Sequence, residues 1–251
     1  MSYRSSALWM LGYPEAALAD ADHAITDARE IGQAATLMHA LAVRSLTHIL
    51  RRNYATADAL GDELVALAEE KGAPFWKALG MMEQGWVSAL NGNASDAIQK
   101  LTFGIASSRS TGATVFLSTF LPDLAKAYAD GGQFDDAWRC IGEAMTAVET
   151  TKEKWFAAEV HRIAGEIALM SPEPDAAIAE AFLERALAVA RAQEAKSWEL
   201  RAATSLARLW RDQGKRDAAR DLLAPVYGWF TEGFDTLDLK EAKALLDALT
   251  A

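Results

Sequence analysis

Apolar residues recur along the chain at the spacing of an α-helix. Between residues 60 and 68, Leu60, Leu64, Leu67 and Ala68 follow one another at helical intervals and would lie on one face. No stretch alternates apolar and polar residues with the period of two that a half-buried β-strand requires. Alanine, the strongest helix former, is abundant, whereas Val and Ile are sparse. The pattern therefore predicts an all-α protein.

The helical pattern itself repeats about every forty residues. Residues typical of a turn between two helices are spaced 40, 40, 40, 42 and 40 apart, at Gly12, Arg52, Gly92, Gly132, Pro174 and Gly214. An alanine follows each of them five residues later, at Ala17, Ala57, Ala97, Ala137, Ala179 and Ala219. A small residue precedes each of them, at Ser5, Ser45, Gly85, Ala125, Gly165 and Ala207. Small residues in this register are expected where the two helices of a unit cross closely.

Each unit is predicted to hold two antiparallel helices of about 17 residues, stacked on its neighbours as in a solenoid. The whole chain, 1–251, is then one repeat domain. Its repeats are expected at about 1–32, 33–72, 73–112, 113–152, 153–194 and 195–233, with an amphipathic capping helix at about 236–250. Bulky aromatic residues at Trp76, Phe116, Phe156 and Trp198 keep the same period, and Trp76 and Trp198 are expected to pack between repeats.

The first helical pair differs from the others. Only about ten residues precede Gly12, so its first helix is short, and Leu8, Trp9 and Leu11 have no predicted element to cover them. An uncovered apolar end is an interface or a liability. We therefore expect the chain to be a piece of a longer protein, or to form a homodimer through this uncapped N-terminal end.

The spacing of a small residue, a glycine seven positions later and alanines five and then seven positions further on resembles that of tetratricopeptide (TPR) repeats. The best copy is GGQFDDAWRCIGEAM, residues 131–145. The unit exceeds the usual 34 residues, and in this it is similar to the C-terminal repeat region of bacterial multidomain adenylate/guanylate cyclase–ATPase signalling proteins. Residues 195–249 carry that resemblance most clearly, and residues 11–25 and 154–169 carry it less specifically. The resemblance implies a TPR-like α–α superhelix that acts in regulation or docking, without an active site of its own.

Charge and composition narrow the possible partners. The net charge of −10 makes nucleic acid and anionic membrane surfaces poor partners, because they are negatively charged too. The single cysteine, Cys140, excludes an internal disulfide, and no apolar run is long enough for a membrane span. We therefore expect a cytoplasmic protein.

Motifs that carry chemistry are missing from the sequence. Its one Gly-Lys pair, Gly214-Lys215, lacks the remaining residues of a phosphate-binding loop, and the four histidines lack metal-ligand spacing. No catalytic, cofactor-binding or metal-binding residue is proposed, and we do not expect an enzyme.

The concave face of the solenoid is the candidate binding surface. Counting from the repeat register, the candidate partner-binding residues are His39, Leu79, Met82, Trp86, Lys126, Arg162, Arg201, Arg208 and Arg211. Leu46, Glu159 and Glu166 are expected on the same face. Trp86 either contacts a partner or only packs. Arg201, Arg208 and Arg211 form a basic stripe that could receive an acidic segment, or they could instead pair with nearby glutamates such as Glu159, Glu166 and Glu199.

The function predicted from these features is docking of another protein segment, or of another domain of the same longer chain. The alternative is a module whose groove senses a small-molecule effector and so controls an attached ATPase or cyclase domain. An enzyme is the third possibility, which the missing convergent set of titratable groups disfavours.

Overall fold

The computed structural model describes residues 4–112 and 115–250, which form thirteen α-helices and no β-strand. The all-α prediction is therefore confirmed. The helices are α1 (Arg4–Met10), α2 (Pro14–Ile31), α3 (Ala34–Leu50), α4 (Tyr54–Glu70), α5 (Pro74–Leu90), α6 (Ala94–Ser110), α7 (Leu117–Asp130), α8 (Phe134–Thr151), α9 (Ala157–Met170), α10 (Ala176–Ala192), α11 (Lys196–Asp212), α12 (Arg216–Tyr227) and α13 (Leu237–Thr250).

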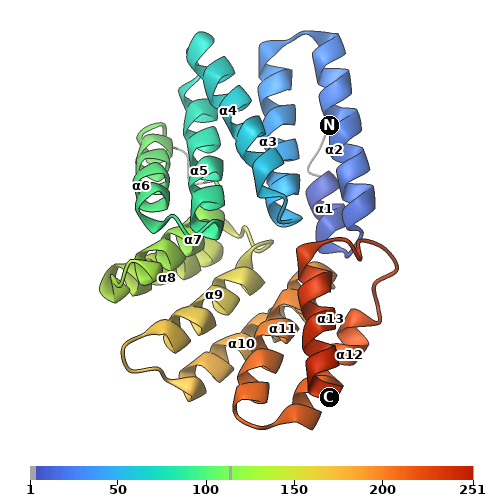
Figure 1. The fold of residues 1–251 in the computed structure, drawn as a ribbon. Coiled ribbons are helices and arrows are strands. Elements are labelled where there is room, and N and C mark those ends of the chain that lie inside the picture. The colour runs from blue at the N-terminus through green and yellow to red at the C-terminus, as the bar shows by residue number, and fades with distance from the viewer. Residues whose placement is uncertain (1–3, 113–114, 251) are drawn as a thin grey trace.

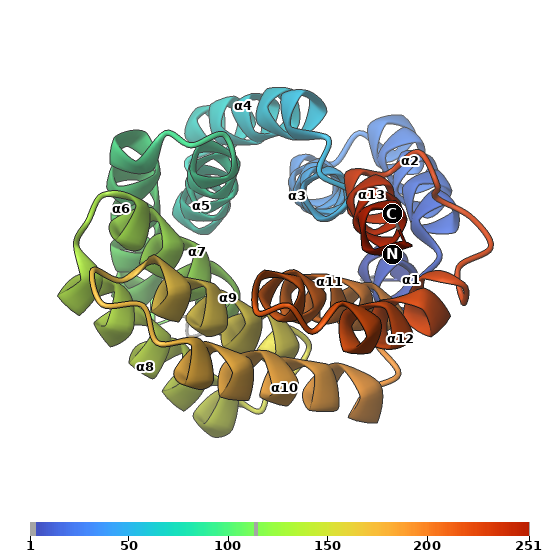
Figure 2. The same cartoon turned by 60° about the horizontal axis from the view of Figure 1, so that its bottom comes forward.

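The helices follow one another as antiparallel pairs (Figure 1), and the pairs are arranged around a ring (Figure 2). Helices α3, α5 and α11 lie on the inner side of the ring, and α4, α6, α8 and α10 lie on the outer side. Each pair packs mainly against its neighbours along the chain. This is the architecture of an α–α solenoid.

Small residues hold the two helices of a pair close together. A Cβ atom added to Gly85 on α5 would lie 2.8 Å from Leu101 Cγ on α6. A Cβ atom on Gly165 of α9 would lie 2.8 Å from Leu183 Cγ on α10. The same contact thus recurs two repeats apart. It explains why the sequence keeps a small residue in this register.

Five of the six turn residues that mark the repeat share a backbone conformation, and Pro174 is the exception. Gly92 and Gly132 have φ angles of 77° and 75°, in the left-handed region that favours glycine. Arg52 occupies the equivalent position with a φ of 60°, and Lys152, in the register that separates repeats, has a φ of 64°. The repeating mark in the sequence therefore reflects a required positive φ.

Two inner helices begin later than their predicted starts. Helix α7 begins at Leu117 instead of 114, and the preceding Phe116 has a φ of 67°, which is incompatible with continuing the helix backwards. Residue 114 itself lies outside the described residues. Helix α9 begins at Ala157 instead of 153, after a turn in which the Ala157 N–H donates to the Lys154 carbonyl. Both differences place aromatic residues in the turn rather than on the helix.

The prediction of an uncovered N-terminal end is wrong for Trp9, whereas Leu11 is 43% exposed as expected. Trp9 is only 2% exposed, and its ring meets that of Trp198 on α11 edge to face, with the centroids 4.6 Å apart. The Ser197 hydroxyl also donates to the Trp9 carbonyl. The curvature of the stack brings the last repeat back to the first, so α11 covers the surface that we expected a second copy to cover. Trp9 itself is therefore not exposed for contact with a second copy, and a homodimer through this end stays a prediction.

Polar contacts complete this closure. The Glu232 carboxylate accepts hydrogen bonds from the N–H groups of Glu15 and Ala16, at 2.8 and 3.1 Å, and so caps the N-terminus of α2. In return, the Glu15 carboxylate accepts from the Gly233 N–H at 2.9 Å. We call this junction the closure seam; it joins α1, the start of α2 and the α3–α4 turn to α11, residues 228–236 and α13.

Candidate functional site

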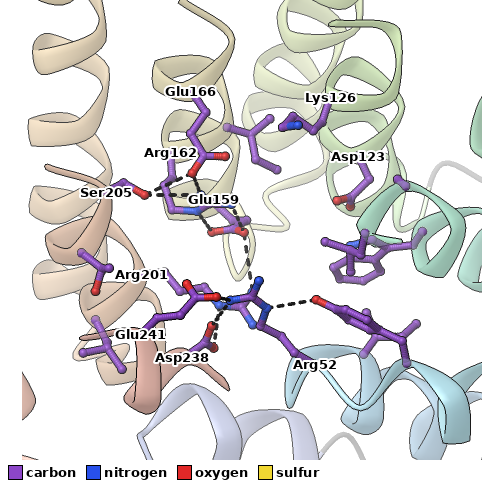
Figure 3. A pocket seen from close by; sticks show the side chains of 18 of the residues that line it. Arg52, Asp123, Lys126, Glu159, Arg162, Glu166, Arg201, Ser205, Asp238 and Glu241 are labelled. Carbon is purple, nitrogen blue, oxygen red and sulfur yellow. Dashed lines mark hydrogen bonds and ion pairs between the residues drawn. The ribbon is translucent and has the colours of Figure 1, made fainter. Parts of the chain in front are cut away.

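A cavity of about 240 Å³ lies at the centre of the ring. Side chains from α3, α5, α7, α9, α11 and α13 line it, together with the α3–α4 turn and the start of α4. Figure 3 shows that most of the labelled side chains are charged. The cavity is therefore built from inner helices of successive repeats, as the register predicts for a concave face.

The structure brings five of the nine candidate residues to this cavity: Trp86, Lys126, Arg162, Arg201 and Arg208. His39 and Leu79 line a second, smaller groove. Met82 is buried, and it packs where a Cβ on Gly104 would lie only 2.4 Å from its Cγ. Arg211 lies outside the cavity lining and pairs with Asp212 at 2.8 Å. The predicted face is thus two separate sites and not one continuous groove.

Trp86 lines the central cavity but is mostly packed. It is 2% exposed, and its ring meets those of Phe120 and Phe156 edge to face, with centroid separations of 5.9 and 5.5 Å. Such pairs stabilise the packing beyond the area they bury. The Trp86 side chain therefore mainly packs α5 against α7 and against the turn before α9.

Four charged residues and one tyrosine that line the cavity were not predicted from the sequence. Arg52 and Tyr54 come from the α3–α4 turn and the start of α4, Asp123 from α7, and Asp238 and Glu241 from α13. One signal was available for Arg52, because it holds a position where four of the six repeats have glycine. The spacing of three between Asp238 and Glu241 also places them on one face of the capping helix.

On α9, Arg162 is held by two glutamates. Its Nε and Nη2 donate to the two carboxylate oxygens of Glu159, both at 2.7 Å, and its Nη1 donates to Glu166. Burial alone would raise the pKa of Glu159, but the charge and hydrogen bonds of Arg162, together with Arg201 and Arg52, hold it below its usual value. Arg162 is therefore already neutralised within its own helix.

The capping helix pairs with two of the three arginines of the basic stripe. Arg201 Nε donates to Asp238 Oδ2 at 2.8 Å, and Arg208 Nη2 donates to Glu241 Oε2 at 2.7 Å. Arg52 Nη1 reaches the same two carboxylates, at 3.3 and 2.9 Å. The acidic segment that the stripe could receive is thus present in the chain itself, on α13.

Arg201 is the most connected of these arginines. Its Nη2 donates to the Leu50 carbonyl at the end of α3 at 2.7 Å. Its guanidinium lies over the rings of Trp9 and Trp198, 5.0 and 5.2 Å from their centroids. It therefore links three elements of the closure seam by ion pairing, helix capping and cation–π contact.

These pairs support the interpretation in which the arginines of the concave face pair within the chain. Glu159 and Glu166 do pair with Arg162, whereas Glu199 bonds to Arg191 and Lys196, away from the cavity. Internal pairing thus accounts for Arg162, Arg201 and Arg208, and none of them presents a free cation.

Asp123 differs from the other acidic groups of the cavity. It is 4% exposed, and its Oδ2 has no hydrogen-bond partner. Lys126, one turn further along α7, bonds instead to both oxygens of Asp130, at 2.6 and 2.7 Å. Burial raises the pKa of Asp123 well above its usual value, and the charge of Glu159 adds to this. Figure 3 shows Asp123 across the cavity from Asp238 and Glu241.

Catalytic and metal chemistry find little support in this geometry. In the described ranges, no three or more His, Cys, Asp or Glu side chains come together as metal ligands. The Cys140 side chain is buried, and burial raises its pKa to about 11, so it is a thiol at neutral pH. No helix in the part of the chain that the structure describes is both long and apolar enough to cross a membrane.

Comparisons with known proteins identify the fold. No protein-family model matches the sequence, and no curated protein matches it. Among solved structures, BtubC (BKLC) from P. vanneervenii is similar, with a TM-score of 0.58 and 17% identity over 94% of this chain and 89% of that one. A kinesin light chain candidate from Podosopora anserina, with nearly identical TPR-like repeats, has a TM-score of 0.47 and 16% identity over 84% and 95% of the two chains. With the repeat geometry above, the likeness to BtubC shows that this chain has a TPR-like α–α solenoid fold.

Proposed function

We propose that the protein is a non-catalytic docking module that binds a segment of another protein, or another domain of a longer signalling protein, at the inner side of its ring. One observation carries this proposal: successive inner helices of a TPR-like solenoid direct their side chains to a single cavity. The sequence resemblance supports a setting in a bacterial signalling ATPase or nucleotide cyclase, and the acidic charge agrees with a cytoplasmic location.

The cavity restricts how a partner can dock. Its volume of about 240 Å³ is below the range of about 300–1,000 Å³ typical of small-molecule sites, so it accepts one or two side chains and no folded element. The arginines are already paired, whereas Asp123 Oδ2 is not. The group that the cavity lacks is therefore a hydrogen-bond donor or cation, such as a Lys side chain of the partner segment.

A selection from a displayed library of short random peptides tests this proposal. We expect wild-type protein to enrich peptides that share a basic residue, and Asp123→Asn to lose their binding by about tenfold or more. The control is Asp58→Asn, an exposed change on α4 that should leave binding intact. Failure to enrich any peptide, or equal binding by Asp123→Asn, would remove the inner cavity as the docking site.

A second candidate is a sensor for a small polar effector. The observation that favours it is the closed ring, whose inner helices surround the cavity. Native mass spectrometry of the purified protein is the test. A retained small molecule that is lost in Asp123→Asn would support the sensor, and an unmodified mass with no binding from a metabolite panel would eliminate it.

A further inference from the structure

A second groove, separate from the central cavity, lies among α3, α5, α7 and the turn before α9. Its volume is about 40 Å³. Five aromatic side chains line it: Phe75, Trp76, Phe116, Phe120 and Trp155. Two of them, Trp76 and Phe116, belong to the aromatic series that recurs with the repeat. The later members of that series, Phe156 and Trp198, are fully buried. Trp76 and Phe116 therefore line a small aromatic groove, whereas the equivalent residues in later repeats are buried in the hydrophobic core.

Two polar groups in this enclosure lack partners. Glu83 on α5 is 3% exposed, and its Oε2 has no hydrogen-bond partner. Thr119 on α7 is 1% exposed, and its Oγ1 also has none. The Ser45 hydroxyl on α3 donates to the Ala57 carbonyl at 3.3 Å, and its proximity partly offsets the rise in the pKa of the Glu83 carboxyl. Leaving a buried carboxyl oxygen unpaired is costly, because the group has lost water without gaining a replacement. Glu83 and Thr119 both line the same groove.

The chemistry of the lining decides among ligand classes. An apolar ligand would leave Glu83 Oε2 and Thr119 Oγ1 unsatisfied, and an anion would meet a carboxyl group with no cation beside it. A metal ion would find only one carboxylate, since no three-residue ligand cluster exists in the described part of the chain. An organic cation, in contrast, is stabilised both by the carboxylate and by the faces of the surrounding rings.

The unpaired acceptors on Glu83 and Thr119 and the small volume of the groove restrict the kind of organic cation that can bind. A quaternary ammonium ion has no N–H group to donate to Glu83 or Thr119, whereas a protonated amine has at least one. About 40 Å³ admits a head the size of an ammonium group and excludes a bulky ring. We infer that this groove binds the protonated amino group of a small alkylamine, with Glu83 and Thr119 as acceptors and the aromatic rings as its walls.

Binding of the cation should be linked to the protonation of Glu83. Burial raises the pKa of the Glu83 carboxyl well above its usual value, so the empty site favours the neutral acid. A bound ammonium group favours the carboxylate, and the proton of Glu83 then passes to solvent. His39 on α3 is the other titratable residue of the lining, and its pKa is lowered by burial, which keeps it neutral at pH 7. Affinity for an amine should therefore rise with pH over the range in which the Glu83 carboxyl loses its proton.

The test compares ligands that differ only in the head group, and it is independent of the docking proposed for the central cavity. Ligand-observed NMR titrations of the full chain use n-butylammonium, n-butanol as its neutral analogue and n-butyltrimethylammonium as a cation without N–H groups. We expect n-butylammonium to bind more tightly than either of the others by about tenfold, since a charged hydrogen bond is replaced in each. Equal binding of the alcohol and the amine, or no amine binding at millimolar concentration, would overturn the inference.

Two variants locate the binding in the groove. Glu83→Gln keeps the size of the side chain and removes its charge, and Thr119→Val removes one acceptor. We expect Glu83→Gln to weaken amine binding about tenfold and to abolish its rise with pH, and Thr119→Val to weaken it by a smaller factor. Glu30→Gln, an exposed change on α2, is the matched control and should bind as wild type does. Unchanged amine affinity in a folded Glu83→Gln protein would place the binding elsewhere and refute the site.

Discussion

The crossings within helical pairs and the closure seam hold this molecule together in different ways. At the crossing of α5 and α6, the contact is apolar and local, with Gly85 against Leu101 sixteen positions along the chain. At the seam, the contacts are charged and join residues far apart in sequence, as when Arg52 pairs with Asp238 and Glu241. The crossing recurs in the same register, whereas the seam occurs once. The repeat thus builds the curve of the solenoid, and non-repeating residues close it into a ring.

The largest loss of stability is expected from a substitution at the centre of the closure seam. Replacing Arg201 with Ala removes the 2.8 Å pair with Asp238, which then keeps only Arg52 at 3.3 Å, and it leaves the Leu50 carbonyl without this donor; the Arg201 side chain is only 13% exposed. Breaking one side of such a buried pair should lower the free energy of unfolding by about 3–5 kcal/mol. Urea unfolding measures this loss, and hydrogen exchange should show new opening at α1.

Arg220→Ala is the control for this experiment. Arg220 also contacts two carboxylates, Asp217 and Asp221, but its side chain is 40% exposed and its partners more so. A surface pair contributes about 0–1 kcal/mol, so this variant should unfold almost as wild type does. Similar losses for the two arginines would show that the seam is no more important than the surface.

The next largest loss of stability is expected at the crossing of α5 and α6. Gly85→Leu adds a side chain whose Cβ would lie 2.8 Å from Leu101 Cγ and 3.0 Å from the Leu101 backbone nitrogen. Overpacking of this kind should cost about 1–3 kcal/mol in unfolding free energy. Gly142→Leu on α8 is the matched control, because a Cβ at Gly142 meets no atom within 4 Å. A thermal melt in which both variants behave alike would contradict the assignment of Gly85 to a tight crossing.

These two regions also explain how much the sequence could predict. Helix type, the forty-residue period and the small residues at Gly85 and Gly165 follow from local spacing, and the structure has all of them. The coverage of Trp9 by Trp198 could not be predicted, since it depends on the total curvature summed over six pairs. A small error in the angle of each pair would leave the two ends far apart.

For the candidate site too, the sequence predicted one group of residues and missed another. The register placed Arg162, Arg201 and Arg208 on the inner side, because the face of a helix follows from its period. It gave no indication that Asp238 and Glu241 would meet those arginines, since α13 lies outside the repeat pattern. Charge pairing between elements needs three-dimensional placement, and helical periodicity alone does not supply it.

A smaller, pH-dependent effect is expected at Asp123. Its pKa is raised in the folded protein by burial and by Glu159, so folding favours the protonated acid. The unfolded chain releases this proton more readily, and Asp123 therefore reduces stability increasingly as pH rises above about 4. Asp123→Asn should be more stable than wild type at pH 7, and the difference should shrink as pH falls towards 4.

Chemical unfolding at several pH values measures this difference. Asp58→Asn, exposed on α4, is the control and should show a constant small difference across the same range. If Asp123→Asn were less stable than wild type at pH 7, the carboxylate would be stabilised by its neighbours, and burial would not be the dominant influence on it.

The smallest effect compares two helix N-termini, one capped from within its repeat and one capped across the seam. Asp175 accepts the N–H groups of Ala177 and Ile178 on α10, both at 2.9 Å, from a position directly before that helix. Glu232 performs the same task for Glu15 and Ala16 on α2 from 217 residues away. Replacing either cap with Ala should cost about 1 kcal/mol, because each change leaves two helix N–H groups without their acceptor.

The two caps differ in which backbone amides should exchange faster when the cap is removed, and not in how much stability is lost. Asp175→Ala should speed hydrogen exchange only at the start of α10. Glu232→Ala should speed it at Ala16 and also at Gly233, whose N–H is held by the Glu15 carboxylate on the other side of the seam. Exchange confined to Ala16 would mean that the two hydrogen bonds are independent. Faster exchange on both sides would show that the seam opens as one unit, so that a ligand able to loosen it at one point would open the central cavity as a whole.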